Sequence, residues 1–265
     1  MFSWLIRAYQ WRTSFVIAAV TTAALAVLWF WFVRDYPGGI HPAENIVSMR
    51  EKTPGSWRRL LTNRNLILLT WAYFCLGYFQ FIFFYWIYYY FGEVRHFGPD
   101  ESARYTTLIF IIMGIMMPSG GWISDRLTRS YGVKFGRRVV PMLGLSLGAL
   151  LLYTGTIVQG TAIAVLALAL ASGFASWCEG PFWASTMQVA EKQVGAACGI
   201  LNTGGNLGGF LAPIFTPYIA SRAGWSWGLY FGSIMAMMGV VACYFIDLSH
   251  QKNQLDTTEP SKASA

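Results

Sequence analysis

Seven apolar runs, each long enough to cross a lipid bilayer as a helix, dominate this sequence. They lie at residues 13–33, 66–91, 105–124, 139–158, 162–188, 195–220 and 226–246. The hydrocarbon core of a bilayer is about 30 Å thick, and about 20 helical residues cross it. Only helices and closed barrels satisfy the backbone polar groups inside lipid. The runs therefore predict an all-α membrane protein with seven transmembrane helices.

Charged residues are rare and avoid these runs. Asp, Glu, Lys and Arg make up 12% of the chain, whereas soluble domains average about 25%. All 19 Lys and Arg residues lie outside the runs, and Glu179 is the one acidic residue inside them. Because an ionised group at mid-bilayer costs at least about 2.5 kcal/mol, this distribution supports the predicted spans.

The basic residues divide unequally between the two membrane faces. The connections and tail on one face carry 14 Lys and Arg residues, and the other face carries 5. Cytoplasmic loops are the ones enriched in these residues, so we expect the N-terminus outside and the C-terminus in the cytoplasm. The first run is too long for a signal peptide and lacks a small-residue cleavage site. Together with the short loops, this favours a bacterial plasma membrane, that is, the inner membrane.

Several function classes have no support in the sequence. The basic residues are dispersed over several loops, which argues against nucleic-acid binding. The sequence has no phosphate-binding loop and no nucleophile elbow, and its histidines lie in loops. The four cysteines lie inside spans without paired spacing and are expected to pack as small apolar residues. We therefore expect neither an enzyme nor a metal site, and no cofactor.

One long polar connection divides the chain. Residues 36–65 contain Pro-Gly turns and mixed charge, typical of a cytoplasmic central loop. The first and last runs both begin near a tryptophan and end at an aspartate, Asp35 and Asp247, as corresponding helices of two repeats would. We expect residues 1–35 to be the last helix of an N-terminal repeat and 66–247 a six-helix repeat. Residues 248–265 are expected to be a disordered cytoplasmic tail, and a missing N-terminal repeat or a partner half should complete the protein.

A Gly-x-x-x-Asp-Arg motif lies at the end of the third run. It consists of Gly121, Asp125 and Arg126, and the basic pair Arg137 and Arg138 follows before the fourth run. An aspartate can accept bonds from donors at a helix end, and the arginines can hold the loop at anionic headgroups. This loop resembles the cytoplasmic gate motif of the major facilitator superfamily, from which it departs by an insertion before the basic pair.

The fifth and sixth runs carry a further resemblance. The fifth contains Glu179-Gly180-Pro181-Phe182-Trp183, and the sixth is rich in glycine and holds Asn202 and Asn206 one helical turn apart. Both segments are similar to those of the anion:cation symporter branch of that superfamily. The resemblance covers nearly the whole chain, which corresponds to the sixth to twelfth helices of a twelve-helix transporter. The resemblance implies a secondary active transporter that moves small organic anions, such as sugar acids or other carboxylates. It also implies rocker-switch alternating access, often coupled to a proton, and sodium is the other possible coupling ion.

Seven residues are candidates for substrate binding or ion coupling. They are Glu179, Trp183, Asn202, Asn206, Tyr78, Gln80 and Tyr85. Glu179 is either a proton or substrate site or a hydrogen-bonded strut, with Trp183 one turn away. The two asparagines either contact the substrate or join helices by hydrogen bonds. The aromatic side chains of the second run either line a cavity or pack against neighbouring helices. No run contains Lys or Arg, so the positive partner of an anion must come from the missing repeat or from helix ends.

Two alternatives to a transporter remain open. Seven spans with an outer N-terminus are also the topology of seven-helix receptors, and the chain could be a half or fragment that does not transport. The glycine-rich sixth run and the similarity between the first and last runs favour the transporter, because a receptor requires neither.

Overall fold

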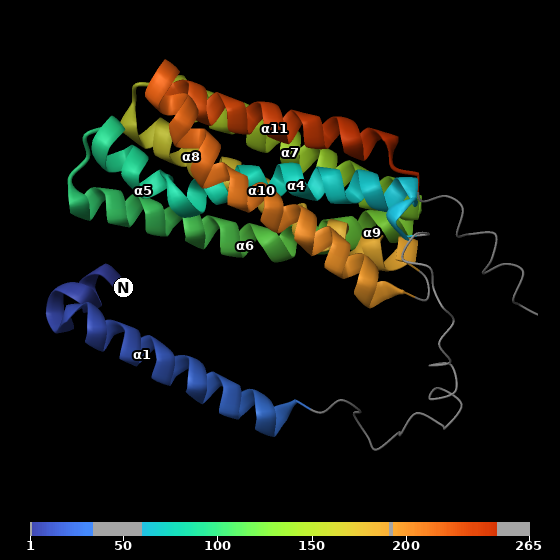
Figure 1. Ribbon diagram of the computed structural model, residues 1–265, viewed down its shortest axis with the longest axis horizontal. Helices are drawn as coiled ribbons and strands as arrows, with labels where there is room; N and C mark the ends of the chain where they lie inside the picture. The colour runs from blue at the N-terminus through green and yellow to red at the C-terminus, as the bar shows by residue number, and fades with distance from the viewer. Residues whose placement is uncertain (1, 34–59, 191–192, 248–265) are drawn as a thin grey trace, which may run out of the picture. The chain divides into compact units, whose positions relative to one another are not determined.

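The computed structural model describes residues 2–33, 60–190 and 193–247, in which all regular structure is helical (Figure 1). The elements are α1 (Phe2–Phe32), α4 (Arg64–Tyr85), α5 (Ile87–Tyr89), the π-helix η1 (Tyr90–Val94), α6 (Pro99–Tyr131), α7 (Val133–Ile157), α8 (Thr161–Ser176), α9 (Glu179–Ala190), α10 (Val194–Ala223) and α11 (Trp225–Phe245). This confirms the all-α fold class. The tail 248–265 and most of the central loop 36–65 lie outside the described residues, so the predicted domain limits stay predictions.

Six helical segments in the described part of the chain are long and apolar enough to cross a membrane. They are Tyr9–Phe32, Arg64–Tyr85, Pro99–Tyr131, Val133–Ile157, Thr161–Ala190 and Trp225–Phe245. Each overlaps a predicted span. The remaining predicted span, 195–220, forms α10, whose 30 residues measure about 45 Å. Its length is sufficient for a crossing, but its asparagines and many glycines lower its hydropathy below that of the other six.

The chain forms two compact units, Met1–Gly55 and Ser56–Ala265. In the described part of the first unit, α1 has non-helical backbone angles at Gln10, where φ is 64°. The long apolar segment after this kink exposes large side chains such as Trp29, Phe30 and Phe32. A surface of this kind suits lipid contact.

The second unit is a bundle built around α4. This helix packs against α10 and α11, while α8 packs against α6 and α7 (Figure 1). Leu76, Phe79 and Ile82 of α4 are fully buried in the core, together with Leu145 of α7 and Leu168 of α8. Large apolar side chains also cover the outside of the bundle, as expected where the solvent is lipid.

Glycines allow α10 to approach α4 closely. A methyl group at Gly208 would collide with the Phe74 carbonyl oxygen and would lie 2.9 Å from the Tyr78 backbone nitrogen. At Gly205, a methyl group would lie 2.5 Å from Cε1 of the Tyr73 ring. Helices in lipid associate through such close van der Waals packing of small residues. The glycine-rich sequence of α10 therefore sets its distance from α4.

Two predicted spans are interrupted helices in the structure. In the run 66–91, α4 ends at Tyr85, and the short α5 and the π-helix η1 follow after Trp86. The run 162–188 is α8 and α9, separated at Trp177 and Cys178. The Trp177 indole nitrogen donates to Ser119 Oγ of α6 at 2.9 Å, which anchors this second break. The apolar runs did not reveal the interruptions, although Gly180 and Pro181 are typical of a helix boundary.

The substitution Gly208→Ala should destabilise the bundle. The added methyl group meets rigid backbone of α4, and overpacking of this kind costs about 1–3 kcal/mol. We expect a thermal unfolding midpoint several degrees lower in detergent, measured by fluorescence. Gly199→Ala in the same helix is the matched control, because a methyl group there would meet no atom within 4 Å. Equal midpoints for the two variants would contradict the proposed packing constraint.

Candidate functional site

Glu179 lies in a hydrogen-bonded cluster that joins α4 and α9. The Tyr73 hydroxyl donates to Glu179 Oε2 at 2.9 Å, and the Trp183 indole nitrogen donates to the Tyr73 oxygen at 3.2 Å. The Tyr73 ring also meets the rings of Phe182 and Trp183 edge-on, with centroids 5.8 and 6.2 Å apart. The predicted pair Glu179 and Trp183 is thus brought together, by a tyrosine that the sequence analysis did not single out.

Local structure places each member of this cluster. Glu179 is the first residue of α9, where the positive end of the helix dipole favours a carboxylate. Pro181 lies in the first turn, where its missing N–H is not needed. Trp183 follows Glu179 by four residues and so lies on the same helix face. On the other side, Gly205 of α10 leaves room for the Tyr73 ring, which is thereby held against α9.

Gln80 extends the polar site along α4. It lies two helical turns from Tyr73, on the same face of the helix, and its amide lies near the Glu179 carboxyl without forming a hydrogen bond of ordinary geometry. Gln80 is only 6% exposed, yet among the described residues no acceptor reaches its Nε2 atom. A buried donor without a partner is costly in a folded protein. It is therefore a group that a bound solute could satisfy.

The predicted residues Asn202 and Asn206 form a pair on an exposed face of α10. Asn206 Nδ2 donates to the Asn202 side-chain oxygen at 3.1 Å and to its backbone carbonyl at 2.8 Å. Both bonds lie within one helix. In the described part of the chain, the pair therefore joins neither the Glu179 cluster nor another helix.

The predicted residues Tyr78 and Tyr85 lie apart from the Glu179 cluster. Tyr78 is buried, and its hydroxyl shares a hydrogen bond of 3.0 Å with Thr216 of α10. Its ring packs edge-on against Phe231 of α11. Tyr85 is exposed at the end of α4 and lies beside Phe81. Tyr78 thus joins three helices, and Tyr85 faces outward.

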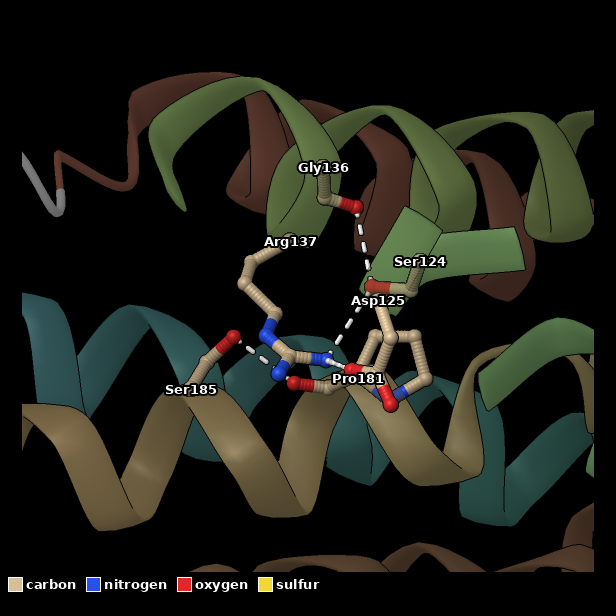
Figure 2. Close-up of polar contacts among 6 residues, drawn as sticks. All are labelled: Ser124, Asp125, Gly136, Arg137, Pro181 and Ser185. Atoms are coloured by element: carbon tan, nitrogen blue, oxygen red, sulfur yellow. Dashed lines mark hydrogen bonds and ion pairs between the residues drawn. The ribbon is translucent and has the colours of Figure 1, made fainter. Parts of the chain in front are cut away.

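The gate motif forms a second polar cluster, between the ends of α6 and α7 (Figure 2). Asp125 Oδ1 lies 2.8 Å from Arg137 Nη1. The same Nη1 donates to Ser124 Oγ at 3.2 Å, and that hydroxyl donates to the Gly136 carbonyl at 3.0 Å. The inserted residues extend both helices, and the chain reverses at Gly132, where φ is 90°. This reversal brings Arg137 back alongside Asp125.

The other arginines of the motif lie on aromatic rings. Arg126 lies over Trp122, with 5.7 Å from Cζ to the ring centroid, and Arg138 lies over Tyr244 at 4.5 Å. Gly121 lies on the side of α6 that faces α9, where a methyl group at Gly180 would be 3.1 Å from Gly121 Cα. Of the motif's three arginines, Arg137 is therefore the one that pairs with Asp125.

A separate set of contacts ties the ends of α4, α7 and α11. Asn65 Nδ2 donates to the Asp247 carbonyl at 2.6 Å, and the Asp247 backbone nitrogen donates to Asn65 Oδ1 at 3.0 Å. Lys134 Nζ lies 3.2 Å from Asp247 Oδ1. The aspartate that the sequence analysis placed at the end of the last span thus fastens three helix ends.

Comparison with known proteins agrees with this architecture. Residues 1–190 and 129–264 match the family model described as Major Facilitator Superfamily. The chain is 26% identical to the "Probable sulfoacetate transporter SauU" of Cupriavidus necator, over 90% of this chain and 57% of that protein. It is 29% identical to the "Hexuronate transporter" of Bacillus subtilis, over 82% and 53%. It is 26% identical to the "Probable galactarate/D-glucarate transporter GudP" of the same organism, over 84% and 53%.

The chain spans about half the length of these curated relatives. The relatives are named as transporters, which agrees with the prediction that the chain is not an enzyme. The apolar helices and the family match together confirm a multi-pass membrane protein. The chain belongs to the major facilitator superfamily.

Proposed function

We propose that this chain forms the C-terminal repeat of a secondary active transporter for small organic anions such as sugar acids. The relatives named for sulfoacetate, hexuronate and galactarate or D-glucarate support this class of solute. The observation that carries the proposal is the partly buried cluster of Glu179, Tyr73 and Trp183, beside which Gln80 Nε2 lacks a hydrogen-bond acceptor among the described residues. Membership of a transporter family favours this reading over a seven-helix receptor.

Glu179 is proposed to carry a coupled proton. No Lys or Arg pairs with it among the described residues, so its charge is not neutralised by a partner. A carboxylate would repel an anionic solute by about 4 kcal/mol at 4 Å, for an effective dielectric constant of about 20. Protonation removes this repulsion, so the solute and the proton bind together. Release of both on the other side of the membrane gives symport.

The rest of the chain would supply the conformational change. Binding sites in such transporters lie at mid-membrane between two repeats, and alternating access comes from rocking one repeat against the other. The close packing of α4 and α10 suits a repeat that moves as one body. The positive partner of the anion would come from the other repeat or from helix ends. We propose a bacterial plasma membrane, with the N-terminus outside and Asp125 and Arg137 on the cytoplasmic side.

The first test is uptake by the full-length gene product in proteoliposomes. Radiolabelled D-glucuronate, D-glucarate and sulfoacetate are supplied separately, with the outside more acidic than the lumen. We expect at least one of them to accumulate, and a protonophore to abolish the accumulation. Empty liposomes are the control. If none of the three solutes enters, with or without the gradient, the proposal for this solute class is wrong.

The substitution Glu179→Gln should separate proton coupling from solute binding. Glutamine is permanently neutral, so uptake driven by the pH gradient should fall at least tenfold, whereas exchange of labelled for unlabelled solute at equal pH should continue. Glu101→Gln, on the exposed first turn of α6, is the control and should retain both activities. Uphill accumulation by the Glu179→Gln variant would show that another group carries the proton.

The substitution Tyr73→Phe should destabilise the cluster. It removes the hydroxyl that bonds the partly buried Glu179 and Trp183, and an unpaired polar group costs up to about 3 kcal/mol when it is fully buried. We expect a lower thermal unfolding midpoint in detergent. Tyr85→Phe is the matched control, because this tyrosine lies on the same helix and is exposed. If the two variants unfold at the same temperature, the cluster does not stabilise the bundle.

A further inference from the structure

The gate motif and the Glu179 cluster meet on the same short helix. Helix α9 has 12 residues and begins at Glu179. The next residue, Gly180, lies so close to Gly121 of the gate motif that a methyl group there would be 3.1 Å from Gly121 Cα. The first turn of α9 thus touches α6 on one side and presents Glu179 to α4 on another.

Arg137 approaches α9 from α7. Figure 2 shows its side chain pointing from α7 toward Pro181 and Ser185 of α9. The side chain is 12% exposed, whereas that of its partner Asp125 is 48% exposed. Ser185 Oγ donates to the Pro181 carbonyl at 2.7 Å, so the part of α9 that faces Arg137 is itself held by a hydrogen bond. The guanidinium group therefore lies between the Asp125 carboxylate and the first turns of α9.

The chain is irregular just before α9, so the contacts of α9 with neighbouring helices are important for its position. The backbone nitrogens of Trp177 and Cys178 bond to the carbonyls of Phe174 and Ala175, three residues earlier, so the regular α-helical ladder from α8 is interrupted. Trp177 is anchored to Ser119 of α6. Contacts with α4, α6 and α7 therefore help to set the direction of α9.

We propose that Arg137 is a positioning residue for Glu179. Its ion pair with Asp125 holds the guanidinium group against the first turns of α9. This contact keeps the Glu179 carboxyl within hydrogen-bond distance of the Tyr73 hydroxyl. When the ion pair opens, α9 is free to shift and the Tyr73–Glu179 bond is lost. Resting on the proposed transport role of Glu179, this links the opening of the cytoplasmic end to the release of proton and solute.

A double-mutant cycle on Asp125 and Tyr73 tests this link. The readout is the rate at which dicyclohexylcarbodiimide modifies Glu179 at fixed pH in the full-length protein in nanodiscs, measured by mass spectrometry of the peptide. Asp125→Asn should raise the rate at least threefold, because the carboxyl is no longer held by Tyr73. Tyr73→Phe should raise it by a similar factor. The double variant should react no faster than the faster single variant, because both changes remove the same bond.

Two variants serve as controls and one as a second probe. Asp125→Glu retains the ion pair and should keep the wild-type rate. Arg126→Gln removes a charge from the same motif without touching the pair and should also keep it. Arg137→Lys keeps the charge but loses the planar guanidinium group, so it should give an intermediate rate. It replaces Asp125→Asn if that variant does not fold.

Three outcomes would overturn the inference. The first is a wild-type rate of Glu179 modification in folded Asp125→Asn and Arg137→Lys. The second is a rate increase in the double variant that equals the product of the two single increases. The third is an equal increase in the rate in Arg126→Gln. If Glu179 is not modified in the wild-type protein, the test is whether modification appears in the variants. If it appears in none of them, the inference is also overturned. The readout does not require transport. A failure of the proton-coupling proposal would therefore appear in the uptake of Glu179→Gln, and not in this cycle.

Discussion

The close approach of α10 to α4 is the constraint on which the second unit depends. In lipid, apolar side chains gain little by leaving one hydrocarbon surface for another, so helices associate mainly through contact area and hydrogen bonds. Gly205 and Gly208 supply that contact by letting two backbones meet. The same approach presses the Tyr73 ring toward α9. The packing of two helices thus determines where the hydroxyl that bonds Glu179 lies.

The polar cluster is also a product of an interrupted helix. A continuous helix from Thr161 to Ala190 would place Glu179 in its middle, where a charged group meets no helix dipole end. The break at Trp177 and Cys178 makes Glu179 the first residue of α9, where the dipole favours the carboxylate. A partly buried acid is thereby supported by a helix end and a tyrosine, without a cationic partner among the described residues.

Hydropathy predicted the helical fold and located the crossings, because the cost of burying charge leaves a strong pattern in the sequence. It also singled out Glu179, as the lone acid within a run. It could not reveal Tyr73, since one tyrosine among many in an aromatic run carries no distinguishing mark until α9 packs against it. Nor could it reveal the break before Glu179, because Trp177 is anchored by Ser119 of α6, 58 residues away in the chain. Contacts between distant segments decide both features.

The low hydropathy of α10 has a consequence for how the protein is made. A segment with two asparagines and many glycines gains little from entering lipid alone. During synthesis it follows α4 by more than a hundred residues, and α4 offers the surface that fits its glycines. Stable insertion of α10 therefore depends on α4 staying accessible in the bilayer until the later helix emerges from the ribosome. The fit between these two helices therefore affects the order of assembly as well as the final structure.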